Sequence, residues 1–243
     1  LDQLPGMLPL SSPLLVERDA ADGGLTLSLG LADEPQRQQQ RPYRVGFGEV
    51  GNLAIFGGAG AGKTTALIST AIAAISQDPD TWIYGIDCGG GHLAALSTLP
   101  NTGAVISGED SDRVVRMLGL VQAIIEERSA TRQAHPPVLL LIDGLATFRD
   151  SYEHRGGGVE ALTTLTEIAR AGRTVGVHVI MSCERSNALP TSLGSSVPER
   201  LVLRLTTDAD YQLLGVAADV LTDAIPGRAL RIGSENEIQI ALP

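Results

Sequence analysis

Short apolar runs alternate with longer helix-prone segments along most of this chain. Five apolar runs predict strands, at residues 52–56, 81–87, 138–143, 175–183 and 200–205. Between them, residues 65–76 are rich in alanine, residues 111–132 carry apolar side chains at helical spacing, and residues 157–173 resemble a further helix. The alternation predicts an α/β fold with a mostly parallel sheet flanked by helices.

Both ends of the chain depart from this alternation. Residues 1–42 are punctuated by prolines and show little helical periodicity, so we expect a lead-in that packs on a main domain at residues 43–243. Within the lead-in, residues 24–30 alternate apolar and polar side chains and predict one half-buried strand. Residues 228–232 and 237–241 flank a short turn and predict a C-terminal β-hairpin.

A phosphate-binding pattern is the strongest chemical signal in the sequence. Every fixed position of G-x-x-x-x-G-K-[ST] is filled by the run Gly57, Gly58, Ala59, Gly60, Ala61, Gly62, Lys63 and Thr64, with Thr65 next. Glycines let successive N–H groups converge on phosphate oxygens, and the following helix adds its positive end. We expect this loop to bind ATP, with Lys63 reaching the β- and γ-phosphates and Thr64 ligating Mg²⁺.

A second apolar strand ends in the carboxylate of Asp143, which is predicted to hold Mg²⁺ together with Thr64. The alternative is an ordinary aspartate that caps the next turn. Hydrolytic proteins with such a phosphate loop commonly carry a glutamate directly after this aspartate to polarise water, but here the next residue is Gly144. We therefore expect weak ATP hydrolysis, and a glutamate placed at position 144 to raise it if the missing base is what limits the rate.

Other charged residues are candidates for the catalytic site. Glu184 directly follows the run 175–183 and is the nearest substitute for the missing base, because parallel strands end at one edge of a sheet. A solvated loop carboxylate is an equally open interpretation of Glu184. Asp87 ends another strand and is a further candidate at the rim. Arg173 and Arg170 are either an arginine finger toward a neighbouring subunit or ordinary surface charges.

Charge and composition indicate which partners and which compartment the chain is suited to. The formal charge of −10 opposes passive binding of nucleic acid, which draws on clustered Lys and Arg. Cys88 and Cys183 are too few for a disulfide framework and suggest a reducing compartment. His178 lies inside an apolar strand and is expected to be a hydrogen-bonded core residue, whereas His92 is expected to be solvated. The low-charge stretch 53–76 is interrupted by the glycine loop, so no membrane span is predicted, and the start without Met suggests a piece of a longer polypeptide.

Several segments together carry a family resemblance. The phosphate loop, the run 171–180 and the run Ser182-Cys-Glu-Arg resemble the FtsK/SpoIIIE branch of RecA-like ATPases. Glu184 stands where that pattern has a sensor glutamine, and Ser186 replaces its proline. The glycine-rich run 84–96 and the pair Asp143-Gly144 also resemble the EccC family of type VII (ESX) secretion ATPases, and most of all its second ATPase domain.

The resemblance implies a RecA-like (ASCE) P-loop NTPase fold and an ATP·Mg²⁺ site with little turnover. It implies a cytoplasmic domain of a protein anchored elsewhere in the inner membrane, with no membrane contact by this fragment. The implied partners are neighbouring ATPase domains of the same chain, a hexameric assembly and ESX-type secreted protein substrates. The usual RecA-like strand order would also hold the sulfurs of Cys88 and Cys183 two strand spacings apart, about 9 to 10 Å, too far for a disulfide.

Two other functions remain open on the sequence. One is a DNA-translocating ATPase of the FtsK type, which the charge of −10 disfavours. The other is a pseudo-ATPase that binds substrate tails and no nucleotide, against which the intact Lys63 and Thr64 speak.

Overall fold

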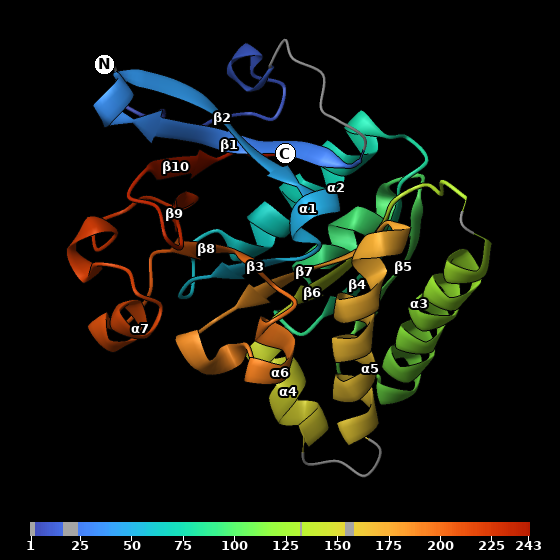
Figure 1. The fold of residues 1–243 in the computed structure, drawn as a ribbon. Coiled ribbons are helices and arrows are strands. Elements are labelled where there is room, and N and C mark those ends of the chain that lie inside the picture. Colours follow the sequence, from blue (N-terminus) through green and yellow to red (C-terminus); the bar gives the residue numbers. More distant parts are fainter. Residues whose placement is uncertain (1–2, 17–23, 132, 154–157) are drawn as a thin grey trace.

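A single twisted sheet organises the chain (Figure 1). The computed structural model describes residues 3–16, 24–131, 133–153 and 158–243. The sheet has ten strands in the order β2-β1-β10-β9-β8-β3-β7-β6-β4-β5. Their bounds are β1 (Thr26–Glu34), β2 (Gln39–Gly46), β3 (Leu53–Phe56), β4 (Trp82–Asp87), β5 (Thr102–Ser107), β6 (Val138–Asp143), β7 (Val177–Cys183), β8 (Glu199–Leu203), β9 (Arg228–Arg231) and β10 (Glu237–Ile240).

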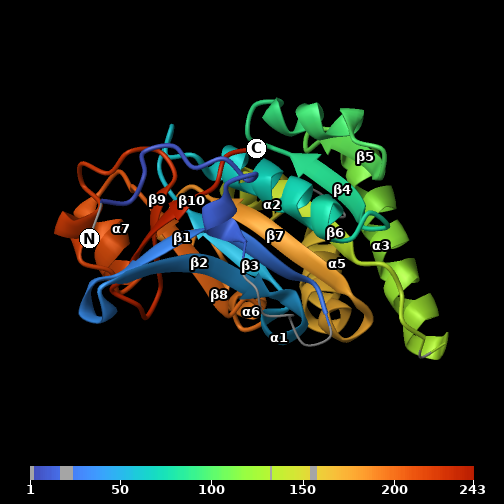
Figure 2. The same cartoon turned by 90° about the horizontal axis from the view of Figure 1, so that it is seen from above.

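Helices lie on both faces of this sheet (Figures 1 and 2). The α-helices are α1 (Phe47–Val50), α2 (Lys63–Gln77), α3 (Ser111–Thr131), α4 (Leu145–Glu153), α5 (Gly158–Ala171), α6 (Thr191–Gly194) and α7 (Asp208–Leu213). Short 3₁₀ turns are η1 (Pro13–Leu15), η2 (Pro35–Arg37), η3 (His92–Thr98), η4 (Gly172–Val175), η5 (Ser186–Ala188) and η6 (Ala218–Val220). None of the described helices is both long and apolar enough to cross a membrane.

The sheet has a parallel half and an antiparallel half. Strands β8, β3, β7, β6, β4 and β5 run parallel. Strands β9, β10, β1 and β2 extend it in antiparallel fashion, and β9 joins the halves by pairing with β8. The predicted α/β fold, its N-terminal strand and its C-terminal hairpin are therefore confirmed, and the strand and the hairpin turn out to be neighbours in one sheet.

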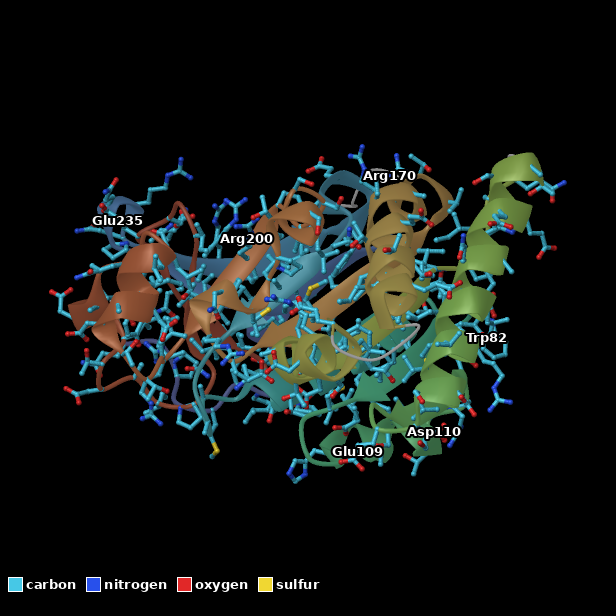
Figure 3. The ribbon with its side chains drawn as sticks, turned by 90° about the horizontal axis from the view of Figure 1, so that it is seen from below. Trp82, Glu109, Asp110, Arg170, Arg200 and Glu235 are labelled. Carbon is cyan, nitrogen blue, oxygen red and sulfur yellow. The ribbon has the colours of Figure 1, made fainter. Side chains whose placement is uncertain are left out.

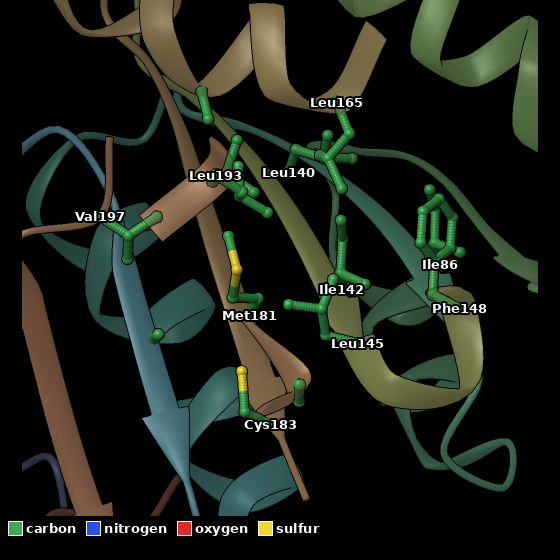
Figure 4. Packing of buried hydrophobic residues seen from close by; sticks show 14 of the residues in the cluster. Ile86, Leu140, Ile142, Leu145, Phe148, Leu165, Met181, Cys183, Leu193 and Val197 are labelled. Atoms are coloured by element: carbon green, nitrogen blue, oxygen red, sulfur yellow. The ribbon is translucent and has the colours of Figure 1, made fainter. Parts of the chain in front are cut away.

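Alternation along the central strands builds a hydrophobic core on each face. In β6, which is buried throughout, Leu140 and Ile142 belong to the cluster formed with α3, α4 and α5. Leu139 and Leu141 point the other way, into the cluster formed with α2 and β1. Figure 4 shows Leu140 and Ile142 packed beside Leu165 of α5. A strand covered on both faces needs apolar residues at every position, which is why residues 138–142 are all apolar instead of alternating with polar residues.

Two strands escape the sequence prediction because each lies at an edge of the sheet. Strand β2 is polar and contains Pro42, and β5 is only partly buried. Neither strand needs the continuous apolar run of a central strand. Strand β2 also runs across residue 42, so the lead-in and the remainder of the chain share one sheet.

Candidate nucleotide-binding site

The phosphate loop joins β3 to α2 at the carboxyl edge of the parallel strands. Gly60 and Gly62 have φ values of 69° and 102°, which favour glycine. The loop is tied to both neighbouring strands, since Gly57 N donates to Cys183 O at 3.0 Å and Gly58 N donates to Arg204 O at 2.8 Å. Its backbone curvature is therefore fixed by the sheet on either side.

The structure brings Lys63, Thr64 and Asp143 to this loop. Lys63 Nζ donates to Gly58 O at 2.9 Å, so the ammonium folds back over the loop. Thr64 Oγ1 donates to Asp143 Oδ2 at 2.6 Å, across 79 residues of sequence. The hydroxyl and the carboxylate expected to share Mg²⁺ are thus direct neighbours.

Ser182 of β7 orients the other oxygen of Asp143. Ser182 Oγ donates to Asp143 Oδ1 at 2.5 Å and accepts from Gly144 N at 2.8 Å. Asp143 is 2% exposed, and both carboxylate oxygens are held by a hydroxyl. Ser182 was not among the predicted site residues, and the only signal for it in the sequence is its place in the family-like run 182–185.

Gly144 has a backbone conformation that favours glycine. Its φ is 86°, and a Cβ at this position would lie 3.0 Å from Glu184 Oε1 and 3.1 Å from the carbonyl of Cys88. A glutamate at position 144 would be strained and crowded. The substitution would therefore disturb the backbone and Glu184, and its effect on ATP hydrolysis stays a prediction.

Glu184 is a half-buried, hydrogen-bonded group rather than a solvated loop carboxylate. Its Oε2 accepts from Ala146 N at 3.1 Å, at the first turn of α4. A carboxylate is stabilised there because the first N–H groups of a helix lack partners within the helix.

Asp87 shapes the loop after β4 instead of standing free at the rim. Its oxygens accept from Gly89 N at 2.9 Å, Gly91 N at 3.1 Å and Leu93 N at 2.8 Å. The loop so formed passes close to the predicted magnesium ligand Asp143, since a Cβ on Gly89 would lie 2.6 Å from Asp143 Oδ2. Only glycine allows this approach.

These elements enclose an open cavity of about 650 Å³. The residues around it come from the phosphate loop, α2 and five other segments: Gly58, Ala59, Gly60, Gly62, Lys63, Thr64, Thr65, Gly89, His92, Asp143, Glu184, Thr206 and Pro226. Four of these residues were not predicted to belong to the site: Gly89, His92, Thr206 and Pro226. The glycine-rich run 84–96 is the one signal in the sequence for Gly89 and His92.

The chemistry of the site fits magnesium. Burial and, after it, the negative charges of Asp87, Glu184, Asp143 and Glu109 together raise the pKa of the Cys88 thiol to about 12. This negative surrounding favours a cation. No group of three or more His, Cys, Asp or Glu side chains suited to a metal occurs within the described residues. Magnesium needs no such cage, because it is usually held by one or two protein oxygens together with phosphates and waters.

Arg173 lies at the opposite edge of the sheet from this cavity. It belongs to η4, before β7 begins, whereas the phosphate loop follows the end of β3, which runs parallel to β7. Its guanidinium donates to Glu49 O at 3.0 Å. Figure 3 likewise shows Arg170 on the edge opposite Glu109. Neither arginine can reach the nucleotide site of its own chain, and a role toward a neighbouring subunit stays a prediction.

The remaining predicted residues lie as expected. His178 is 2% exposed, and its Nδ1 is 2.8 Å from Gly51 O, which confirms a hydrogen-bonded core histidine. Strand β6 separates β4 from β7, and Cys88 and Cys183 are free thiols.

Known proteins resemble this chain over nearly its whole length. EccC, an ESX secretion system protein of Thermomonospora curvata, is 29% identical over 258 residues, which cover 93% of this chain and 19% of EccC. EccC4, an ESX-4 secretion system protein of Mycobacterium tuberculosis, is 29% identical, with 97% of this chain and 20% of EccC4 covered. The chain therefore spans about a fifth of the length of these relatives.

Solved structures give the same picture. EssC (ATPases 2 and 3) from Geobacillus thermodenitrificans superposes with a TM-score of 0.83 at 25% identity, covering 100% of this chain and 48% of that one. EccC (ATPases 2 and 3) of T. curvata, in complex with a signal sequence peptide, gives a TM-score of 0.79 at 27% identity, with coverages of 99% and 47%. The profile of the FtsK/SpoIIIE family matches residues 17–232. Since that match runs through nearly the whole sequence, this chain belongs to the FtsK/SpoIIIE family.

Proposed function

We propose that this chain is an ATP-binding module of a type VII secretion ATPase and that it binds ATP together with Mg²⁺. The observation that carries the proposal is the contact of 2.6 Å between Thr64 Oγ1 and Asp143 Oδ2 beneath a complete phosphate loop. The likeness to EccC and EssC supports the secretion role.

Each group at the site has a defined task in this proposal. The loop N–H groups and the start of α2 bind the phosphates, and Lys63 neutralises the β- and γ-phosphates. Thr64 and Asp143 hold Mg²⁺, while Ser182 keeps the Asp143 carboxylate in its orientation. Bound Mg²⁺ would neutralise charge on the phosphates.

The module would act within a larger assembly. The solved relatives carry ATPases 2 and 3 in one chain, of which this chain covers about half, so we propose neighbouring ATPase domains as partners. We further propose a cytoplasmic position in an inner-membrane-anchored protein, a hexameric motor and ESX-type secreted substrates. The EccC relative bound to a signal sequence peptide makes protein substrates reasonable. In a hexamer, Arg173 would face a neighbour's nucleotide, because it lies on the edge opposite its own.

Turnover by the isolated module would be slow, because Arg170 and Arg173 lie at the edge opposite the cavity and cannot assist within the same chain. ATP would then act mainly as a structural and switching ligand between domains.

Lys63 allows a direct test, because it is the only lysine in the 243 residues. Saturating ATP with Mg²⁺ should raise the melting temperature by about 5 to 10 °C, as expected for ligand at about 100 times Kd. It should also protect Lys63 from an amine-reactive reagent, read by peptide mass spectrometry. Lys63→Ala should abolish the thermal shift, and Arg170→Ala, an exposed cation at the opposite edge, should keep it. A full shift in Lys63→Ala would contradict the proposal.

A further inference from the structure

Gly144 and Glu184 lie next to each other in space, and this arrangement points to a catalytic carboxylate directly after β7. We propose that Glu184, at the end of β7, orients and deprotonates the water that attacks the γ-phosphate, in place of the glutamate absent at position 144. The inference rests on the proposed binding of ATP and Mg²⁺.

The Glu184 carboxylate lies beside Gly144. Glu184 Oε1 lies 3.0 Å from the point that a Cβ of residue 144 would occupy. The carboxyl group from β7 therefore fills the space into which a side chain directly after Asp143 would project. It lines the same cavity as Lys63 and Thr64.

A hydrogen bond to the start of α4 orients the Glu184 side chain. Its Oε2 accepts the backbone N–H of Ala146 at 3.1 Å, so the side chain is fixed at the first turn of α4. One oxygen anchors the group, and Oε1 remains to accept a hydrogen bond from water. An oriented base is what general-base catalysis requires.

A side chain at position 144 and the observed placement of Glu184 exclude each other. A side chain at position 144 would collide with Glu184, and the φ of 86° disfavours any residue but glycine. The glycine is then the condition for this placement of Glu184, rather than a sign that the carboxylate is lost.

The reaction is ordinary hydrolysis. The water oxygen bonds to the γ-phosphorus, the bond from that phosphorus to the β–γ bridging oxygen breaks, and the electron pair leaves with ADP. The proton lost by water passes to the Glu184 carboxylate and then to solvent. The products are ADP, phosphate and a proton, and no further reactant is needed.

A purely structural cap is the competing role for Glu184, and Glu184→Gln separates the two. The amide oxygen of glutamine can still accept from Ala146 N, but the amide cannot take a proton from water. Glu109→Gln is the matched control, because Glu109 is an exposed carboxylate near Cys88 that does not line the nucleotide cavity.

The test is a single-turnover measurement with protein in excess over radiolabelled ATP, with Lys63→Ala as background. We expect Glu184→Gln to hydrolyse ATP about 10²-fold more slowly than the wild type or worse, with an unchanged ATP·Mg²⁺ thermal shift and bound nucleotide recovered as ATP. Glu109→Gln should match the wild type. Equal rates in Glu184→Gln and wild type, or a wild-type rate no higher than the background, would overturn the inference. Absence of a wild-type thermal shift would instead refute the proposed function.

A second measurement tests the packing without nucleotide. Gly144→Ala should lower the melting temperature less in a Glu184→Ala background than in the wild type, because the oxygen 3.0 Å away has been removed. An equal loss in both backgrounds would show that Glu184 does not occupy this space.

Discussion

Burial controls the protonation of His178. The ring packs 5.3 Å from Phe47, centroid to centroid, and its Nδ1 lies 2.8 Å from the carbonyl of Gly51. Burial lowers the pKa of His178 to about 4, although the hydrogen bond to Gly51 opposes the shift. The folded chain therefore holds His178 neutral at pH values where the unfolded chain binds a proton.

Stability should fall as pH drops below about 6.5, the pKa of an unperturbed histidine. The unfolded state takes up the proton first, so the free energy of unfolding decreases by about 2 kcal/mol between pH 6.5 and 5 and continues to fall toward pH 4. Urea melts across this range should show the loss in the wild type and in the control His92→Gln. His178→Gln should lack it, and the same slope in that variant would contradict the assignment.

At the scale of elements, Asn52 joins four parts of the fold just before β3 begins. Its Nδ2 donates to Ala169 O of α5 at 2.8 Å and to Ser196 O, beyond α6, at 2.7 Å. Its Oδ1 accepts from Val179 N of β7 at 2.7 Å. Asn52 is 1% exposed, so bulk water cannot replace these hydrogen bonds.

Replacing Asn52 with alanine should therefore cost roughly 3 kcal/mol or more, since buried backbone groups would be left without partners. The measurement is the free energy of unfolding in urea. Asn187→Ala, at an exposed position, should change it little. A loss below about 1 kcal/mol in Asn52→Ala would mean that water or neighbouring groups replace these bonds.

The helices and strands that could be predicted from the sequence are those with a well-buried face. The helices at 63–77 and 111–131 and the central strands were predicted within a few residues, because burial on one or two faces imposes a clear apolar pattern. The helix predicted at 157–173 begins at Gly158 and ends at Ala171, continuing as η4. The edge strands β2 and β5 and the short helix α4 were missed, since partial exposure leaves their patterns mixed.

At the scale of the whole molecule, a polar cluster around the buried Glu199 ties the antiparallel extension to the parallel strands. Glu199 of β8 is 4% exposed. It accepts from Tyr43 Oη of β2 at 2.6 Å and from Arg231 Nε of β9 at 2.7 Å. The extension also brings the two ends of the chain together, because Leu10 N donates to Leu242 O at 2.8 Å.

The net charge leads to a prediction about nucleic acid. At −10, the chain should be repelled by duplex DNA, and we expect no saturable binding of a short duplex at 0.15 M salt by fluorescence anisotropy. DNA should likewise not stimulate ATP hydrolysis. Repeating the titration at 0.05 M salt is the control, since binding that strengthens steeply there would reveal a basic surface and favour a DNA translocase.

The strand, glycine loop and helix, with Lys63 and Thr64, could be predicted from the sequence alone, because a phosphate loop is a run of residues at fixed local spacing. Asp143 could be predicted because it ends a continuous apolar strand. The partners that reach the site from other strands became visible in the folded sheet. Ser182 holds Asp143, Glu184 fills the space beside Gly144, and Arg173 lies at the far edge. Strand order sets these relations across separations of 38 residues and more, which no local pattern records.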